Sequence, residues 1–340
     1  MRKLIWLALL LACIVLPLGA YVRLSGAGLG CPDWPGCYGQ ISPAQAAPAI
    51  HLAVLADPDG PVSLGKAWKE MVHRYLASAL GMCLLLYGWQ AWRQRRGRRA
   101  ATLLLLLLVL QAGLGMWTVT GLLQPAVVSA HLLLGMLLTA VLAWQALQPR
   151  LPSLTVGPAC LWQMRGLLLL LLGQVVLGGW VSSHQAALVC QGFPQCNGSW
   201  WPALQIGQAF SFSPTGWTEE GLITMHWLHR LLALLVVTGL CGTAWQLWPY
   251  RSLRSQLRCL LLAVLLQVGL GICNVLLQRP LLLSLAHTMG AMLVLVLLFT
   301  LLCRLQTLAA WRPGRIGHQH WPDPSLAVLL HDKHVGAGPL

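Results

Sequence analysis

Long apolar runs, separated by short polar connections, occupy most of the chain. Eight of them are about 20 residues long, the length that a helix needs to cross the hydrocarbon core of a bilayer. A membrane β-barrel would instead show short segments of alternating polarity. The pattern therefore predicts an all-α integral membrane protein with eight transmembrane helices. These helices are expected at about residues 4–22, 68–92, 100–120, 126–147, 162–183, 221–247, 257–277 and 281–303.

The first apolar run follows Met1-Arg2-Lys3, an arrangement that imitates a secretory signal. No clear small-residue cleavage site follows this run, and the chain continues directly through Tyr21-Val22-Arg23. We therefore interpret the run as the first membrane span.

The distribution of charge predicts the orientation. Only 9% of the 340 residues are charged, and the net charge is +14. A basic excess can indicate a nucleic-acid partner, but here the basic residues gather in every second connection, so the expected partner is the lipid bilayer. The positive-inside rule then places both termini in the cytoplasm and the long connections, about 23–67 and 184–220, on the outer side. The basic positions are Arg2, Lys3, Arg93, Arg95, Arg96, Arg98, Arg99, Arg150, Arg165, Arg251, Arg254, Arg258, Arg304, Arg312 and Arg315.

The first half of the sequence recurs in the second half. Gln111-Ala112-Gly113-Leu114-Gly115 returns 156 residues later as Gln267-Val268-Gly269-Leu270-Gly271. Two homologous four-helix bundles follow, with the same orientation because each has an even number of spans. We expect an N-terminal unit at 1–150, a C-terminal unit at 151–310 and a disordered cytoplasmic tail at 311–340.

Four histidines lie near the outer ends of four spans, at matched positions of the two halves: His73, His131, His229 and His287. All four spans run inward from the outer side, so at about 1.5 Å per residue the imidazoles lie at similar shallow depth. Two helices of each unit therefore offer one imidazole each. A haem with two axial histidines in a four-helix bundle requires this arrangement.

Other interpretations of the histidines remain open. A single intramembrane histidine can simply hydrogen-bond a neighbouring helix. Zinc is a weaker candidate than haem, because no third ligand is present in both units. Gly113, Gly115, Gly269 and Gly271 would let a flat macrocycle approach the backbone, or would let two helices pack closely.

Glu70 is the acidic residue that heads into a membrane segment. Burying a charged side chain near lipid costs about 2.5 to 3.5 kcal/mol even on lenient scales. Either a chemical role or an ion pair with Arg74 or Lys69 must offset that cost. The shift of 156 residues places His226 at the position of Glu70. Only the first unit therefore has a carboxylate beside its histidine pair, which suggests one chemical centre and one electron-carrying centre.

Arg74 and Arg230 each follow the first histidine of a pair. They could bind haem propionates, because a guanidinium matches a carboxylate, or they could extend to the membrane interface.

Two cysteine pairs fall in the long outer connections, Cys31 with Cys37 and Cys190 with Cys196. Each pair could form a structural or a redox-active disulfide, and the structural interpretation is favoured. His51 and His184 lie in the same connections, where we expect them to be solvated.

Together these residues resemble the haem A synthases of bacterial and mitochondrial membranes. The resemblance covers nearly the whole chain up to about Arg304. It rests on eight spans in two related halves and on Glu70-x-x-His73-Arg74, His131, His229-Arg230, His287 and the Cys-x5-Cys pairs.

The resemblance implies an oxidoreductase that converts the C8 methyl of haem O to the formyl of haem A by successive hydroxylations and loss of water. It implies substrate haem at His73 and His131, a haem b cofactor at His229 and His287, and a catalytic role for Glu70. It also implies a multi-pass protein of the bacterial inner membrane, an unidentified electron donor, and haem O synthase and terminal oxidases as neighbours.

Three other functions are considered. A dihaem b-type cytochrome for electron transfer would need no Glu70, and a membrane thiol oxidase would depend on the cysteine pairs with the histidines structural. A transporter is disfavoured because broken-helix signals are missing from the spans.

Overall fold

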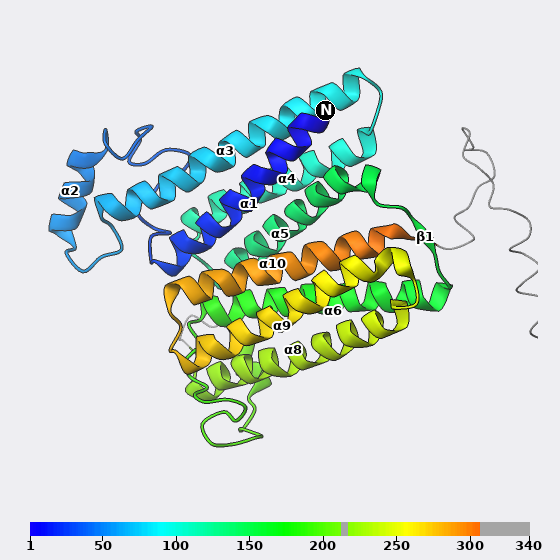
Figure 1. Ribbon diagram of the computed structural model, residues 1–340. Coiled ribbons are helices and arrows are strands. Elements are labelled where there is room, and N and C mark those ends of the chain that lie inside the picture. The colour runs from blue at the N-terminus through cyan, green and yellow to red at the C-terminus, as the bar shows by residue number, and fades with distance from the viewer. Residues whose placement is uncertain (212–216, 307–340) are drawn as a thin grey trace, which may run out of the picture.

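The computed structural model describes residues 1–211 and 217–306, so the expected tail at 311–340 lies outside the described residues. The described part is mostly helical (Figure 1). In chain order the elements are α1 (Arg2–Leu24), α2 (Ala47–Ala56), α3 (Leu64–Arg93), α4 (Arg98–Thr120), α5 (Pro125–Leu147), η1 (Gln148–Arg150), β1 (Leu154–Thr155), α6 (Pro158–Ser183), α7 (Ile206–Ala209), α8 (Glu219–Leu247), η2 (Arg251–Leu253), α9 (Arg254–Leu276), α10 (Leu281–Arg304) and β2 (Leu305–Gln306).

Within the described residues, seven helices are long and apolar enough to cross a membrane: α1, α4, α5, α6, α8, α9 and α10. The protein is therefore an all-α, multi-pass membrane protein. The remaining long helix, α3, has 30 residues but is less apolar, because its first turns contain Lys66, Lys69, Glu70, His73 and Arg74.

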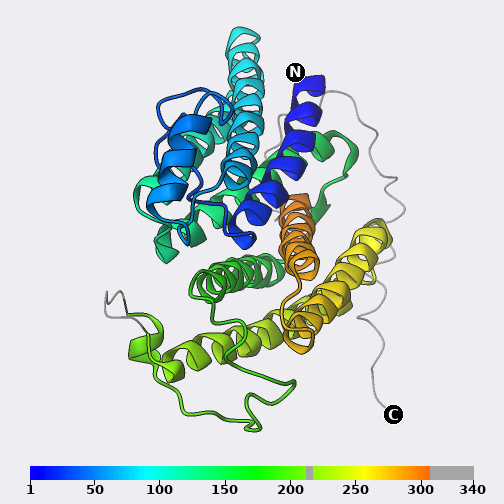
Figure 2. The same cartoon turned by 90° about the vertical axis from the view of Figure 1, so that its left-hand side faces the viewer.

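The long helices form two closed rings of four. In one ring α1 contacts α3 and α5, and α4 contacts the same two helices. In the other ring α6 contacts α8 and α10, and α9 contacts the same two helices. The rings lie against each other through α5 with α6 and α10, and through α1 with α10 (Figures 1 and 2).

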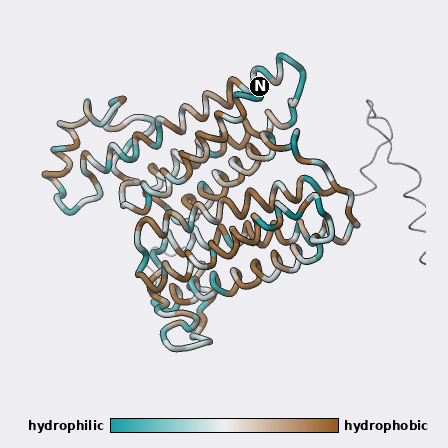
Figure 3. The backbone as a smooth tube through the Cα atoms, viewed as in Figure 1, coloured by the Kyte–Doolittle hydropathy of each residue, from teal (hydrophilic) through white to brown (hydrophobic). Residues whose placement is uncertain are grey.

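Apolar side chains face outward as well as inward. Leu106, Val109 and Leu265 are more than half exposed, and Trp245 is 86% exposed. A soluble protein rarely exposes so much apolar surface, whereas lipid accepts it. In Figure 3 the helices are mainly brown along their length and teal at their ends, as expected for a bilayer-facing surface.

The segment between the rings is fixed at one end of the molecule. Leu154 pairs in parallel with Leu305, and Thr155 with Gln306. Arg304 is only 2% exposed. Its guanidinium donates to the Pro152 carbonyl at 3.1 Å and to Oε1 of Gln256 at 2.7 Å. A buried guanidinium is costly unless its donors are satisfied, so these contacts hold the linker against the end of α10.

The two long connections contain more structure than expected from the sequence. The first contains α2 and a Cys31–Cys37 disulfide, and the second contains the short α7 and a Cys190–Cys196 disulfide. Both disulfide loops lie at the end of the bundle where α3 and α8 begin, and they cover the helix ends that carry the candidate site.

Candidate functional site

Glu70 is 4% exposed and lies two turns into α3. The helix begins at Ser63, whose hydroxyl accepts a hydrogen bond from the Lys66 N–H at 3.2 Å, a typical N-cap. One carboxylate oxygen of Glu70 pairs with Arg74, one helical turn further on, and the other accepts the Cys31 N–H at 3.0 Å. The ion pair considered from the sequence therefore forms with Arg74.

Lys69 does not join this ion pair; it lies over the Tyr21 ring, with its Nζ 5.1 Å from the ring centroid. Both oxygens of the Glu70 carboxylate are therefore fixed in direction, one by Arg74 and one by the disulfide loop.

Arg74 joins α3 to the first disulfide loop. Its Nη1 donates to the carbonyls of Asp33 at 2.7 Å and Pro35 at 3.3 Å, and also to the Gly36 carbonyl. The loop is further ordered by the Asp33 carboxylate, which accepts the N–H groups of Tyr38 at 2.6 Å and Gly39 at 2.8 Å.

Arg230 makes the corresponding contacts in the second half. It donates to the carbonyls of Cys190 at 2.8 Å and Gln195 at 3.1 Å, and its Nε lies 3.3 Å from Nε2 of His226. His226 thus takes the position that Glu70 takes beside Arg74. The proposed propionate-binding role of Arg74 and Arg230 stays a prediction, but much of their hydrogen-bonding capacity is directed to the loops.

Each of the four histidine rings lies against a glycine of a neighbouring helix. A Cβ at that glycine would come 2.7 to 3.1 Å from the ring Cε1, so the ring would have to shift to make room for it. The pairs are Gly19 with His73, Gly115 with His131, Gly178 with His229 and Gly271 with His287. Gly113 and Gly269 would meet nothing within 4 Å, so only two of the four glycines singled out in the sequence contact a histidine.

Three of the histidines also have a glutamine amide beside Nε2. The amide nitrogen lies 3.4 Å away for Gln111 with His131, 3.4 Å for Gln174 with His229 and 3.3 Å for Gln267 with His287. At His73 the position equivalent to Gln174, at a shift of 159 residues, is Val15. Sequence analysis missed Gln174, because the shift that relates the cysteine pairs places a valine at the matching position of the first half.

A cavity of about 390 Å³ lies inside the ring of α6, α8, α9 and α10. Its lining includes both histidines of the second half, both of their glutamines and both of their glycines. The Nδ1 atoms of His229 and His287 are buried, and neither has a hydrogen-bond partner among the described residues. The imidazoles of His229 and His287 are also close enough to interact electrostatically. The same holds for His73 and His131 in the N-terminal ring of helices.

These features fit a haem better than a bare metal ion. A haem supplies its own four equatorial nitrogens, so two imidazoles complete the iron. Zinc takes three or four protein ligands, and no group of three or more His, Cys, Asp or Glu side chains suited to a metal occurs in residues 1–211 and 217–306. The cavity volume is within the usual range for ligand sites.

The two connection histidines differ from each other. His51 is exposed on α2, as expected. The prediction for His184 is wrong, because this side chain is only 9% exposed. Its Nδ1 lies 2.8 Å from the Trp180 carbonyl oxygen. Its ring packs edge-on against the ring of Trp217, with 4.1 Å between the two ring centroids. Burial lowers the pKa of His184 below its ordinary value. Aromatic residues that fold back over the end of α6 exclude water from this side chain.

The sequence matches the COX15-CtaA family of cytochrome oxidase assembly proteins over residues 2–299. The chain belongs to this family. It is 38% identical over 316 residues to the heme A synthase of Shewanella oneidensis, covering 88% of this chain and 96% of that relative. The heme A synthase of Methylorubrum populi is 31% identical over 322 residues, 86% of this chain and 84% of that protein. The heme A synthase of Halalkalibacterium halodurans is 29% identical over 306 residues, 85% and 90% respectively.

Membership of the COX15-CtaA family agrees with the resemblance drawn from the sequence. The matched region includes all four histidines, Glu70 and both disulfide loops.

Proposed function

We propose that this protein is a haem A synthase, an oxidoreductase that converts the C8 methyl group of haem O to the formyl group of haem A for terminal oxidases. The family and the relatives named for this activity support the reaction. The observation that carries the proposal is a pair of histidines in each ring of helices, each packed against a glycine of a neighbouring helix. Only the pair in the N-terminal ring has a buried carboxylate, that of Glu70, beside it.

The N-terminal ring is the substrate site in this proposal. His73 and His131 would hold the iron of haem O, and Glu70 would lie beside the methyl group to be oxidised. Two successive hydroxylations give a hydrated aldehyde, which loses water to become the formyl group. Glu70 can hold or transfer a proton during these steps, because Arg74 and the Cys31 N–H orient both of its oxygens.

The C-terminal ring is the cofactor site in this proposal. His229 and His287 would hold haem b, which supplies electron transfer when bound. Gln174 and Gln267 would orient the two imidazoles, since groups that contact a ligand side chain commonly fix its direction. His226, where the first ring has Glu70, leaves this ring without the carboxylate needed for the chemistry.

The membrane arrangement proposed with this function has eight spans, with α3 as the eighth, in two parallel units of one duplication. Both termini are on the cytoplasmic side of the bacterial inner membrane. The disulfide loops face the outer side, where thiols can oxidise. The electron donor is unidentified, and haem O synthase and terminal oxidases are neighbours in the pathway.

Haem extraction tests the proposal. Protein is purified from cells that make haem O, and the extracted haems are separated and identified by mass. Haem A or its hydroxylated precursor beside haem b is the expected result. Haem b alone, with haem O available, would replace the proposal with a dihaem cytochrome for electron transfer.

A further inference from the structure

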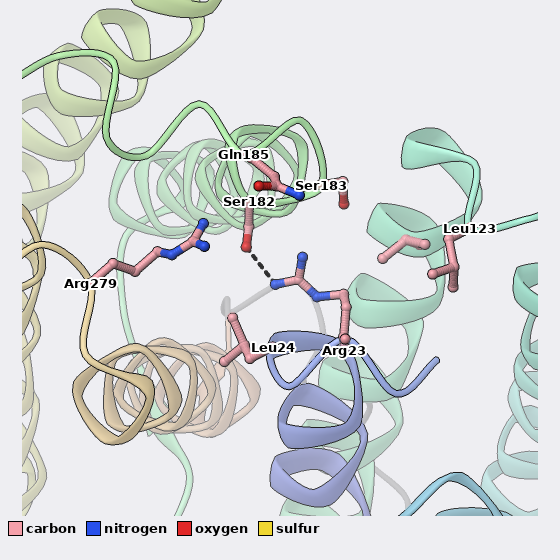
Figure 4. A pocket seen from close by; sticks show the side chains of 9 residues that line it. Arg23, Leu24, Leu123, Ser182, Ser183, Gln185 and Arg279 are labelled. Carbon is pink, nitrogen blue, oxygen red and sulfur yellow. Dashed lines mark hydrogen bonds between the residues drawn. The ribbon is translucent and has the colours of Figure 1, made fainter. Parts of the chain in front are cut away.

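A second cavity, of about 250 Å³, lies where the two rings meet. Arg23 enters it from the end of α1, and Arg279 enters from the turn between α9 and α10 (Figure 4). The rest of its lining is small, polar or aliphatic and includes Ser182, Ser183 and Gln185. In Figure 4 the two guanidinium groups approach Ser182 from opposite sides.

The two arginines have no acidic partner among the described residues. The one ion pair in that part of the chain joins Arg74 to Glu70. Arg23 donates a hydrogen bond to the Ser182 hydroxyl, and it lies near enough to Arg279 for the two charges to repel. The Ser183 hydroxyl is buried and has no hydrogen-bond partner in the described structure. Two half-buried cations beside an unsatisfied hydroxyl form a site for an anion.

The backbone places one cation from each ring in this cavity. Arg279 has φ of 61°, and its N–H donates to the Asn274 carbonyl at 2.7 Å. Leu123 occupies the corresponding turn between α4 and α5, with φ of 58° and a 2.8 Å bond to Thr118. A left-handed conformation is uncommon for such side chains, so both turns are specifically held. Arg23 and Ser182 also occupy matching positions of the two halves, at the shift of 159 residues that relates the cysteine pairs.

This cavity adjoins the histidine cavity of the C-terminal ring. Arg23, Leu24, Ser182 and Arg279 line both. Gly178, which contacts the His229 ring, lies four residues before Ser182 on α6, so the two are one helical turn, or about 6 Å, apart. A flat ligand held by His229 could therefore extend its polar edge to the arginines. A lipid headgroup would have no such connection to the histidines.

We infer that Arg23 and Arg279 bind the carboxylates of the haem held by His229 and His287. Two guanidinium groups match the two propionates of a haem in number and charge. Because Arg23 comes from the other ring, the cofactor edge would also join the two halves. This inference rests on the proposed cofactor site and assigns its carboxylate contacts to residues other than Arg74 and Arg230.

The test compares haem-loaded wild type with Arg23→Gln, Arg279→Gln and the double variant. Haem loss to excess apomyoglobin is expected to become about 10- to 100-fold faster per arginine, because a hydrogen bond to a charged group is lost. The reduction midpoint of the haem should fall, because a cation near the iron no longer favours the reduced form. Arg23→Lys and Arg279→Lys keep the charge, so their haem retention and reduction midpoint should lie between those of the Gln variants and wild type. This intermediate result separates lost charge from misfolding.

Arg258→Gln is the matched control, an exposed arginine near the opposite end of α9. Its haem loss and midpoint should equal those of wild type. An unchanged rate of haem loss and an unchanged midpoint in the double variant would overturn the inference. If the double variant instead lost bound phospholipid phosphate, the arginines would bind a lipid headgroup, which would also overturn the inference. Failure of the proposed function is recognised separately, by haem content that does not change in His229→Ala and His287→Ala.

Discussion

The carboxylate of Glu70 and the backbone N–H of Cys31 are joined by a hydrogen bond of 3.0 Å. The bond connects α3 to a disulfide loop 39 residues earlier in the chain. Through Arg74, the same loop also contacts the other oxygen of the carboxylate. The position of the candidate catalytic group is therefore set jointly by α3 and by the first disulfide loop.

Glu70→Gln is expected to abolish conversion of haem O while both haem sites remain loaded. The amide keeps the size of the side chain but cannot take up a proton, and general acid–base catalysis contributes about 10²- to 10⁴-fold. Turnover and haem content are measured on the same purified sample. Glu219→Gln, in the first turn of α8, is the control and should keep both. Normal haem A production by Glu70→Gln would remove the catalytic assignment.

The two disulfides are expected to differ in their effect on turnover. In Cys31→Ser/Cys37→Ser the first loop loses a disulfide that contributes about 2 kcal/mol to the free energy of unfolding. Its contacts with Glu70 and Arg74 should therefore loosen. Turnover should fall several-fold with haem b retained. The matched variant Cys190→Ser/Cys196→Ser loosens the loop that contacts Arg230, so it should mainly lower haem b retention.

Haem b content, turnover and thermal midpoint are compared for the two disulfide variants. Equal and complete loss of turnover, with haem content and thermal midpoint unchanged, would instead favour redox-active disulfides.

His229→Ala and His287→Ala are each expected to deplete haem b while the substrate haem is retained. Each variant removes one of the two imidazoles that face the 390 Å³ cavity. The pyridine haemochrome spectrum of the purified protein measures the result. His51→Ala, on the exposed face of α2, serves as the control and should bind haem like wild type. Unchanged haem b in either ligand variant would contradict the assignment of the pair.

Gly178→Ala is expected to destabilise the protein by about 1 to 3 kcal/mol, the usual cost of overpacking. The new methyl group would come 3.0 Å from Cε1 of His229 and push the ring off its position. The thermal midpoint should fall and the haem absorption spectrum should shift. Gly173→Ala in the same helix is the matched control, because its Cβ would meet nothing within 4 Å. There alanine should raise helix stability by about 0.5 to 1 kcal/mol. Equal thermal midpoints and haem spectra in the two variants would show that Gly178 does not fix the position of the His229 ring.

The sequence predicted the all-α membrane class because apolar runs of membrane length are unambiguous. It also singled out Glu70 and the four histidines, since charge and duplication make them conspicuous, and all five lie on long helices. It did not show that Arg74 and Arg230 contact the disulfide loops. Those contacts are made to backbone carbonyls, which leave no trace in residue type.

The environment of individual side chains was harder to predict. His184 was expected in water, but it is covered by Trp180 and Trp217, which approach only when the second connection folds back. The contact between Gly19 and His73 depends on which faces of α1 and α3 meet, and α1 is rich in apolar residues on every face. Helical periodicity gives little help in a membrane for this reason.

The pairing of Leu154 with Leu305 also has a consequence for the order of events during synthesis. The linker strand leaves the ribosome about 150 residues before its partner, a delay of roughly 8 to 30 s at 5 to 20 residues per second. During that interval the ring of α1, α3, α4 and α5 can assemble around Glu70, while the linker lacks the strand that later pairs with it. The joint between the halves therefore closes last, when α10 is complete and Arg304 reaches Pro152.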